Sequence, residues 1–318
     1  EPSWRVANPP FWLAVGFAAS LILFAMALRH RRGQWPAGVA VALLFAVLVW
    51  QPWPAAITPR ALELTAIDVG QGDSLLVIFP EGRVMVVDGG GVLQFGRRAS
   101  ASTRRPNLDT GEDVVSPYLW TRGIRRIDIL VATHAHEDHT GGLAALLENF
   151  HPRQLWVGAN PSDRLLRRAA ELKIPVISHH AAPAFDYAGA HVEVLSPPAG
   201  YAAKPGNTAK PGNTVKPGNN DSLAMRITYS ENSFLLTGDM EAPMERRLLE
   251  DGRLAHADVL KVGHHGSKTS TSPDFLDAVS PSVAVISAGF ENSFGHPHRD
   301  ILARLNERHA AILRTDRD

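Results

Sequence analysis

The sequence contains no cysteine, and its 32 lysines and arginines equal its 32 aspartates and glutamates, so the formal net charge is zero. The lack of cysteine excludes disulfide bonds and thiolate metal sites, so any metal ligands must be histidines and carboxylates. The lack of net charge argues against a protein that packages DNA, but not against an enzyme that contacts nucleic acid locally. Hydrophobic residues make up 45% of the 318 residues, enough for the core of one large or two small domains.

Residues 1–60 differ from the remainder in their long apolar runs, and the chain begins with Glu1 rather than Met, which indicates a fragment or a processed product. The uncharged run over 11–28 exceeds the minimum of roughly 17 residues with which a helix spans a bilayer core. The second run, over 39–50, is shorter but has tryptophans near its ends, as membrane-interface anchors do. We predict two transmembrane helices in residues 1–60, and buried core helices or a signal peptide are the less favoured alternatives.

A cationic loop, Arg29-His30-Arg31-Arg32, connects the two apolar runs. Short loops that are rich in lysine and arginine stay on the cytoplasmic side of a membrane. The residues after Pro54 are therefore predicted to lie on the opposite, extracytoplasmic side of the membrane.

Short strands and helices alternate through residues 61–318. Apolar segments bounded by glycine turns predict three strands before residue 91, and the apolar strand over 127–133 ends just before a histidine cluster. This alternation predicts a layered α/β domain with its helices on the outside. The repeat AKPGNT, AKPGNT, VKPGNN at 203–220 lacks core-forming residues and is predicted to be a disordered insertion, and the arginine-containing segment 96–111 is predicted to be a surface loop.

The strongest chemical signal is THAHEDHTGG, residues 133–142. His134 and His136 alternate at the end of a predicted strand, whereas Asp138 and His139 follow at the start of a predicted helix. Three imidazoles and one carboxylate within six residues form a ligand set that suits zinc, manganese or iron. A solvated polar loop is the alternative, and four ligand-type residues at this spacing argue against it.

Two later segments end in the same kinds of residue. The apolar strand FLLTGD (234–239) presents Asp239, and the apolar strand LKVGHHGS (260–267) presents the pair His264-His265. An α/β scaffold places a site at one rim of its sheets, where such strand ends meet. The three segments together therefore predict a single metal site.

These motifs resemble the metallo-β-lactamase superfamily and, within it, the hydrolase domain of ComEC-type competence proteins, which are membrane channels that take up transforming DNA. The motifs that carry the resemblance are DVGQGDS (68–74), VVDGG (86–90), THAHEDHTGG (133–142), NDSL (220–223), FLLTGDME (234–241), LKVGHHGSKTSTSPDFL (260–276) and GHPH (295–298). The resemblance implies an α/β metallo-β-lactamase αββα sandwich after two transmembrane helices. It also implies a bacterial inner membrane, with the hydrolase domain in the periplasm.

The resemblance implies two divalent metal ions, manganese or zinc, as cofactors. The metal ligands that it implies are His134 and His136 on the first metal, Asp138, His139 and His265 on the second metal, and Asp239 between the two. Either member of the pair at 264 and 265 could bind metal, and we assign His264 to the substrate phosphate. Catalytic roles fall to Asp138 and His264.

One position departs from the pattern of the superfamily, in which many members carry a further histidine on the first metal. The corresponding region here reads Asn219-Asn220-Asp221-Ser222. Asp221 or Asn220 is the candidate replacement, and the pair His179-His180 is a less favoured one. An oxygen-richer site favours a harder ion, so manganese is as well supported as zinc.

Several polar residues lie near the paired histidines in the sequence and are candidates for substrate binding: Ser267, Lys268, Ser270, His296 and His298. An ordinary polar loop is the alternative for the first three, and His298 could equally be the first residue of a helix. The resemblance implies a phosphodiesterase or nuclease that acts on single-stranded DNA beside the DNA-uptake machinery at the membrane, without a nucleotide cofactor. A metal-dependent esterase of the cell envelope and a DNA-guiding module that does not cut are the alternatives, and the complete ligand set argues against the latter.

Overall fold

The computed structural model describes residues 9–31, 33–50, 53–91, 108–180, 183–201 and 218–317. The chain divides into two compact units, one comprising Glu1–Ile57 with Pro117–Arg125 and the other comprising Thr58–Ser116 with Arg126–Asp318. Most of the insertion predicted at 203–220 and most of the loop predicted at 96–111 lie outside the described residues.

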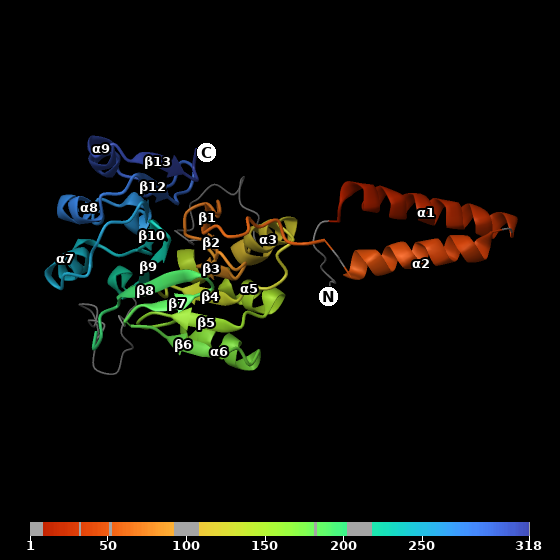
Figure 1. Ribbon diagram of the computed structural model, residues 1–318, viewed down its shortest axis with the longest axis horizontal. Coiled ribbons are helices and arrows are strands. Elements are labelled where there is room, and N and C mark those ends of the chain that lie inside the picture. The colour runs from red at the N-terminus through yellow and green to blue at the C-terminus, as the bar shows by residue number, and fades with distance from the viewer. Residues whose placement is uncertain are drawn as a thin grey trace. The chain divides into compact units, whose positions relative to one another are not determined.

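The first unit contains the two predicted apolar helices, α1 (Phe11–His30) and α2 (Gln34–Trp50), which run side by side (Figure 1). The rings of Phe17 and Phe45 pack between them with centroids 6.3 Å apart. With a mean hydropathy of 2.3, α1 is long and apolar enough to cross a membrane, whereas α2 has only 17 residues. The second membrane span therefore stays a prediction.

Most of α3 (Ser116–Thr121) also belongs to the first unit. The guanidinium of Arg122, just after this helix, donates a hydrogen bond of 3.0 Å to the carbonyl oxygen of Ala56. Arg125 donates to the carbonyl oxygen of Trp50 over 3.3 Å. These bonds tie the segment after α2 to the segment after α3.

The second unit is built on two mixed sheets. The first sheet has the order β1-β2-β3-β4-β5-β6, in which β1 to β3 are antiparallel and β3 to β6 are parallel. Its strands are β1 (Glu63–Ala66), β2 (Leu75–Ile78), β3 (Val84–Val87), β4 (Ile129–Ala132), β5 (Gln154–Val157) and β6 (Val176–Ser178).

The second sheet has the order β13-β12-β11-β10-β9-β8-β7. Strands β7 to β10 are antiparallel, and β10 to β13 are parallel. Its strands are β7 (Phe185–Tyr187), β8 (Ala190–Ser196), β9 (Ala224–Tyr229), β10 (Asn232–Leu236), β11 (Val259–Lys261), β12 (Val283–Ile286) and β13 (Ala311–Arg314).

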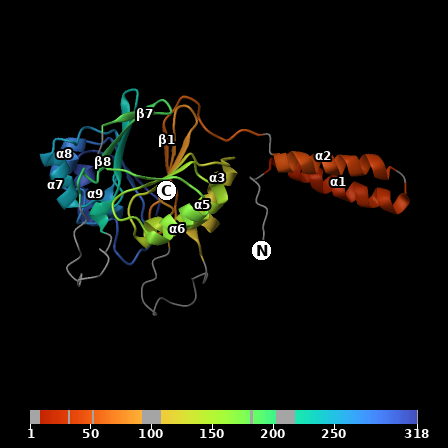
Figure 2. The same cartoon turned by 90° about the horizontal axis from the view of Figure 1, so that it is seen from below.

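The two sheets pack face to face, because one buried cluster joins Leu75 and Met85 of the first sheet to Val192 and Met225 of the second. The longer helices cover the outer faces (Figures 1 and 2), with α5 and α6 on one side and α7, α8 and α9 on the other. These helices are α5 (Leu143–Phe150), α6 (Asp163–Glu171), α7 (Ala242–Glu250), α8 (Pro273–Val279) and α9 (Arg299–Glu307). The arrangement is the predicted α/β αββα sandwich.

Sequence patterns located most of these elements, but they missed the two edge strands β7 and β13. An edge strand pairs on one side only, so it needs no continuous apolar run. Exposed and half-buried residues alternate in β13, for example. The helix predicted over 141–150 begins at Leu143, and a separate short helix, α4 (Glu137–Thr140), precedes it.

Candidate metal centre

The residues with metal-binding chemistry follow the carboxyl ends of three strands. His134 follows β4, and Asp138 and His139 lie in the short helix α4 directly after it. Asp239 follows β10, and His265 lies in the turn η3 (Gly263–Gly266) after β11. Because β4, β10 and β11 all belong to the parallel parts of the two sheets, their ends bring residues that are distant in sequence to one rim.

Gly238 lets Asp239 point into the site. Its φ of 53° lies in the left-handed region, which favours glycine. A Cβ atom at this position would lie 3.0 Å from Ser222 Oγ and 3.1 Å from Thr133 Cβ. A side chain there would therefore push the turn away from both neighbouring loops.

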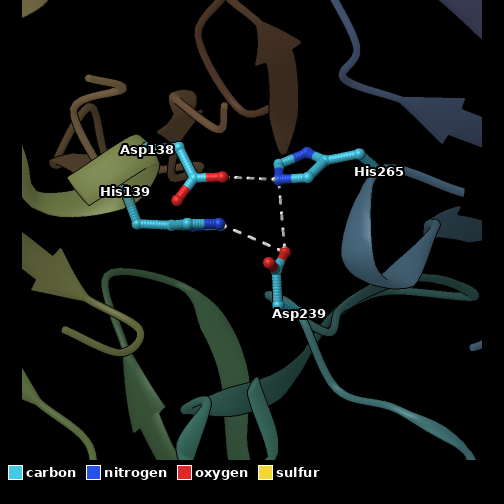
Figure 3. A group of neighbouring side chains, drawn as sticks. All are labelled: Asp138, His139, Asp239 and His265. Atoms are coloured by element: carbon cyan, nitrogen blue, oxygen red, sulfur yellow. Dashed lines mark ion pairs between the residues drawn. The ribbon is translucent and has the colours of Figure 1, made fainter. Parts of the chain in front are cut away.

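Ligand-type atoms gather in three groups among the described residues: Asp73, Asp88 and His139 form one, and the other two share Asp239. The four-residue group comprises Asp138, His139, Asp239 and His265 (Figure 3), and the three-residue group comprises His134, His136 and Asp239; in each, the ligand atoms lie within 4.8 Å of one another. His265 Nε2 lies 3.4 Å from Asp138 Oδ2 and 3.6 Å from Asp239 Oδ1, and His139 Nε2 lies 3.2 Å from the same Asp239 oxygen. The structure thus brings together all six residues that the sequence predicted as ligands.

The four-residue group fits a divalent cation. His139 Nε2, His265 Nε2 and Asp239 Oδ1 are buried, and none of these three atoms has a hydrogen-bond partner. Buried polar atoms without partners are rare in folded proteins and call for an explanation such as a bound ion. Imidazole nitrogens and carboxylate oxygens that converge in this way are a ligand set for zinc or manganese.

Burial and charge act against each other on the pKa values of this group. Burial would lower the pKa of His265, but the carboxylates of Asp239 and Asp73 outweigh it and raise this pKa to about 9. Burial would also lower the pKa of His139, but the carboxylates of Asp239 and Asp88 raise this pKa well above the ordinary value. Burial alone would raise the pKa of Asp239, but His139 and His265 hold it well below its usual range. Protons on the two histidines therefore balance the carboxylates, and a divalent cation would displace these protons.

Asp88, just after β3, orients one of these histidines. Its carboxylate accepts hydrogen bonds from the Thr133 backbone N–H at 2.8 Å and the Thr133 hydroxyl at 2.6 Å, and it lies 2.7 Å from His139 Nδ1. This bond turns His139 Nε2 toward Asp239. Carboxylates that hold the remote nitrogen of a metal-binding imidazole fix its orientation. Asp88 lies in the motif VVDGG but was not among the predicted site residues; a carboxylate at a strand end was the available signal.

Asp73 lies next to the other buried histidine, His265, and is itself paired with Lys261. Asp73 Oδ1 lies 3.5 Å from His265 Nδ1, which also lies 3.0 Å from the carbonyl oxygen of Ser287. Asp73 Oδ2 pairs with the ammonium of Lys261 at 2.8 Å, and the two side chains are 2% and 0% exposed. Burial would raise the pKa of Asp73, but Lys261 and His265 together with His139 outweigh it and hold this pKa far below its usual range. The sequence reasoning assigned neither residue.

The pair at 264 and 265 divides as the sequence analysis assigned it. His265 is buried within the four-residue group, whereas the side chain of His264 is 24% exposed. His264 Nδ1 lies 3.1 Å from Glu241 Oε1, and its Nε2 lies 3.9 Å from Asp239 Oδ2. His264 therefore sits at the accessible edge of the site, beside Glu241, which the sequence reasoning did not single out.

The structure argues against Asp221 and Asn220 as the missing ligand of the first metal. The carboxylate of Asp221 accepts hydrogen bonds from Asn160 Nδ2 at 3.0 Å, from the Tyr201 hydroxyl at 3.0 Å and from the Gly218 N–H at 2.9 Å. Both of its oxygens are thus used to hold its own loop. Asn220 Oδ1 accepts from the Glu241 N–H at 3.0 Å.

Neither member of the alternative pair lies in a ligand group found among the described residues. His179 packs on Trp156, with ring centroids 4.2 Å apart, and His180 is exposed. Two other residues of the region 219–222 contact the site. Asn219 Nδ2 lies 3.3 Å from His264 Nδ1. Ser222 Oγ lies 3.4 Å from His134 Nδ1 and accepts the Asp239 N–H at 3.0 Å.

The candidate substrate-binding residues differ in their surroundings. The Ser270 hydroxyl donates to the carbonyl oxygen of Gly263 at 2.7 Å, so its single hydrogen is not free for a phosphate. His298 caps α9, because its Nδ1 accepts the Asp300 N–H at 3.3 Å. The structure therefore argues against a phosphate contact for Ser270. His298 stays a prediction, because the cap uses only its Nδ1.

The remaining three candidates stay predictions. Ser267 is buried with its hydroxyl 3.0 Å from that of Thr269, and Lys268 is exposed. His296 is half-buried, with its ring centroid 5.6 Å from that of His264. Burial and the neighbouring His264 lower the pKa of His296 to about 4. Among these three, His296 lies next to the accessible edge of the site.

Residues 67–289 match the family model of the metallo-beta-lactamase superfamily. The chain belongs to this superfamily. The two sheets and the outer helices are those of the metal-dependent hydrolase fold of this family, and the ligand groups could hold metal ions. The fold that the motifs predicted is therefore confirmed.

Competence proteins are among the relatives of this hydrolase domain. The chain is 31% identical to ComE operon protein 3 of Bacillus subtilis over 98% of this chain and 39% of the relative. It is 30% identical to competence protein ComA of Neisseria gonorrhoeae over 99% of this chain and 39% of the relative. Recombination protein 2 of Haemophilus influenzae is 29% identical over 86% of this chain and 30% of that protein. The predicted resemblance to ComEC-type proteins is confirmed, and the chain spans about two fifths of the length of the first two relatives.

Solved structures also resemble this chain, at low identity and with TM-scores below 0.5. CmlA, a diiron β-hydroxylase from Streptomyces venezuelae, has a TM-score of 0.49 and 16% identity over 81% of this chain and 53% of that chain. The metallo-beta-lactamase fold protein YhfI from Bacillus subtilis has a TM-score of 0.48 and 10% identity over 80% of this chain and 96% of that chain. At these identities the likeness is one of fold alone.

Proposed function

We propose that this hydrolase domain is a two-metal phosphodiesterase that cuts single-stranded DNA during uptake through a membrane channel. The observation that carries the proposal is the sharing of Asp239 by two ligand groups, one of which contains three buried atoms without hydrogen-bond partners. Two divalent ions, manganese or zinc, would activate water and neutralise the charge that develops on a phosphodiester. The names of the relatives, competence protein and recombination protein, favour DNA as the substrate.

The chain's own residues would hold the reacting groups. His134 and His136 would bind one ion, Asp138, His139 and His265 the other, and the charge of Asp239 would hold both together. Asp88 restricts the His139 ring through its bond at 2.7 Å. These groups are already oriented, and all of them except the half-buried His136 are buried, so little rearrangement would oppose the reaction.

His264 would bind the phosphate at the open edge of the site. Its Nδ1 is held by Glu241 at 3.1 Å, which leaves Nε2 as the ring atom that lies 3.9 Å from Asp239 Oδ2. An imidazole fixed at one nitrogen can present the other to a phosphate oxygen without a large loss of side-chain entropy. We assign catalytic roles to His264 and to Asp138.

The experiment uses the full chain in detergent micelles, stripped of metal and reloaded with manganese or zinc. Its substrates are a single-stranded oligonucleotide, the matching duplex and bis(p-nitrophenyl) phosphate. We expect the unaltered chain to cleave the single strand only when metal is bound. Asp239→Asn should lose at least one of the two ions, because two unshielded cations repel strongly. Its activity should therefore fall by orders of magnitude. The control is Asp186→Asn, whose side chain is 90% exposed and which should behave as the unaltered chain.

The outcomes separate the alternatives. Full activity of Asp239→Asn, or cleavage by the stripped chain, would overturn the two-metal proposal. Hydrolysis of carboxylic esters from the cell envelope without any cleavage of phosphodiesters would point to the esterase. DNA binding without hydrolysis of any substrate would point to a module that guides DNA.

The membrane proposal concerns the inner membrane of a bacterium and a periplasmic hydrolase domain. It is supported by the apolar helix α1 and by the cationic residues Arg29, His30 and Arg31 at its carboxyl end. A reporter that is active only in the cytoplasm, fused after Asp316, should therefore be silent. Strong reporter activity would place the domain on the cytoplasmic side.

A further inference from the structure

A row of aromatic rings starts at the candidate metal centre and ends on the loop between β12 and α9. The rings of His265 and His296 have centroids 6.5 Å apart and are inclined by 26°. Those of His296 and Phe294 are 5.7 Å apart and inclined by 24°. The row leads outward, because His265 is 1% exposed whereas Phe294 is 41% exposed. Phe290, on the same loop, is 76% exposed.

Hydrogen bonds within the loop hold this row in place. Asn292 Nδ2 donates to the carbonyl oxygen of Gly289 at 2.8 Å, and Asn292 Oδ1 accepts the His296 N–H at 3.0 Å. The Gly289 N–H donates to Gln71 Oε1 at 3.1 Å, which ties the loop to the segment before β2. Because the loop is already held in one conformation, a ligand that stacks on it would immobilise few further rotatable bonds of the protein. The entropic cost of binding is therefore lower than for a loosely held loop.

The composition of the loop favours an uncharged aromatic ligand. Residues 288–298 contain no lysine or arginine, and their one charged side chain other than histidine is that of Glu291. The loop is therefore not suited to follow a phosphate backbone. Exposed phenylalanine rings do suit nucleobases, which stack on aromatic side chains with little dependence on their identity. In a duplex the faces of the bases are covered by their neighbours, so only unpaired bases could use such rings.

We propose that Phe294 and Phe290 form a stacking platform for unpaired bases of the DNA strand, beside the phosphate that is cut. The proposal rests on the proposed function and deepens it, because it makes the domain specific for single strands. The ring of His296 joins Phe294 to His264, the residue assigned to the phosphate, with a centroid separation of 5.6 Å from the latter. A base attached next to that phosphate would therefore be within reach of Phe294.

The test compares Phe294→Ala with Phe294→Tyr in the full chain, in detergent micelles with manganese. The substrates are a single-stranded oligonucleotide and the same strand with abasic sites in place of its bases. We expect Phe294→Ala to raise KM for the normal strand by about 5- to 150-fold, toward the value for the abasic strand. Phe294→Tyr keeps the ring and should preserve the preference for bases. Val176→Ala, which alters a 40% exposed apolar residue on β6, is the matched control and should leave both KM values unchanged.

A second measurement separates this proposal from the proposed function. Stacking quenches the fluorescence of a single strand that contains 2-aminopurine. This fluorescence can be followed in EDTA, which removes the metal and so prevents metal-dependent cleavage of the strand. Quenching that Phe294→Ala abolishes would support the platform even in a chain that cuts no DNA. If Phe294→Ala cleaves DNA with the same ratio of KM for the abasic strand to KM for the normal strand as the unaltered chain, the stacking platform is overturned. The proposed phosphodiesterase activity would not be affected by this result.

Discussion

Replacement of Lys261 by methionine should destabilise the hydrolase domain strongly. The ammonium of Lys261 lies 2.8 Å from Asp73 Oδ2, and both side chains are almost completely buried. It also donates to the carbonyl oxygen of Val262 at 2.9 Å. Methionine fills a similar volume but leaves the buried Asp73 carboxylate without its ammonium partner, and the more distant His265 Nδ1, at 3.5 Å, does not replace it.

The size of the effect follows from the loss of that partner. Removal of one partner of a buried ion pair costs about 3–5 kcal/mol. In a domain of this size each kcal/mol lowers the melting temperature by about 2–4 °C, so we expect a fall of about 6–20 °C. Adding Asp73→Asn to Lys261→Met removes the stranded charge, so the double variant should regain more than half of the lost stability.

The assay is thermal unfolding of the full chain in detergent and EDTA, followed by circular dichroism. The control is Arg308→Met, which breaks the surface pair with Asp277, where the distance is 2.6 Å but the Asp277 side chain is 67% exposed. Surface pairs contribute about 0–1 kcal/mol, so this variant should melt within a few degrees of the unaltered chain. A melting temperature of Lys261→Met no lower than that of Arg308→Met would refute the reasoning, as would a double variant no more stable than Lys261→Met.

Further predictions concern the residues around the site. Asp88→Asn should lower metal affinity by about 10- to 100-fold, because the carboxylate that orients His139 is lost; calorimetric titration that finds unaltered affinity would contradict this role. Asp221→Ala should lower the melting temperature but keep the metal content per chain, and loss of an ion would restore Asp221 as a ligand. Burial and Asp221 raise the pKa of Tyr201 from 10.0 to about 12. Tyr201 should therefore contribute stability that is complete below pH 10 and is lost as the pH rises toward 12, and Tyr201→Phe should lack this loss.

Much of the fold was predictable, because the alternation of short apolar strands and helices depends on local sequence. The strands β2, β3, β4, β10 and β11 are nearly continuous apolar segments that are buried in the two sheets. The strands β7 and β13, at the two edges of the second sheet, were not predicted: β7 has only three residues, and exposed and half-buried residues alternate in both. Their pairing is a property of the assembled sheet and leaves no strong periodic signal in the sequence.

The sequence by itself determined the local part of the site. His134, His136, Asp138 and His139 lie within six residues at the end of a strand, so their proximity required no knowledge of the fold. The ligand chemistry was also determined, since a chain without cysteine can offer only imidazoles and carboxylates for such a metal centre.

Only the tertiary structure decided which distant residues join that cluster. His264 and His265 are neighbours with similar left-handed backbone conformations, φ 47° and 54°, yet one is partly exposed and the other is buried against Asp138 and Asp239. Asp221 carries the same carboxylate as Asp239, but its oxygens are used by its own loop. The physical reason is that residue type and spacing define what a side chain can bind, whereas the packing of two sheets defines which atoms it meets.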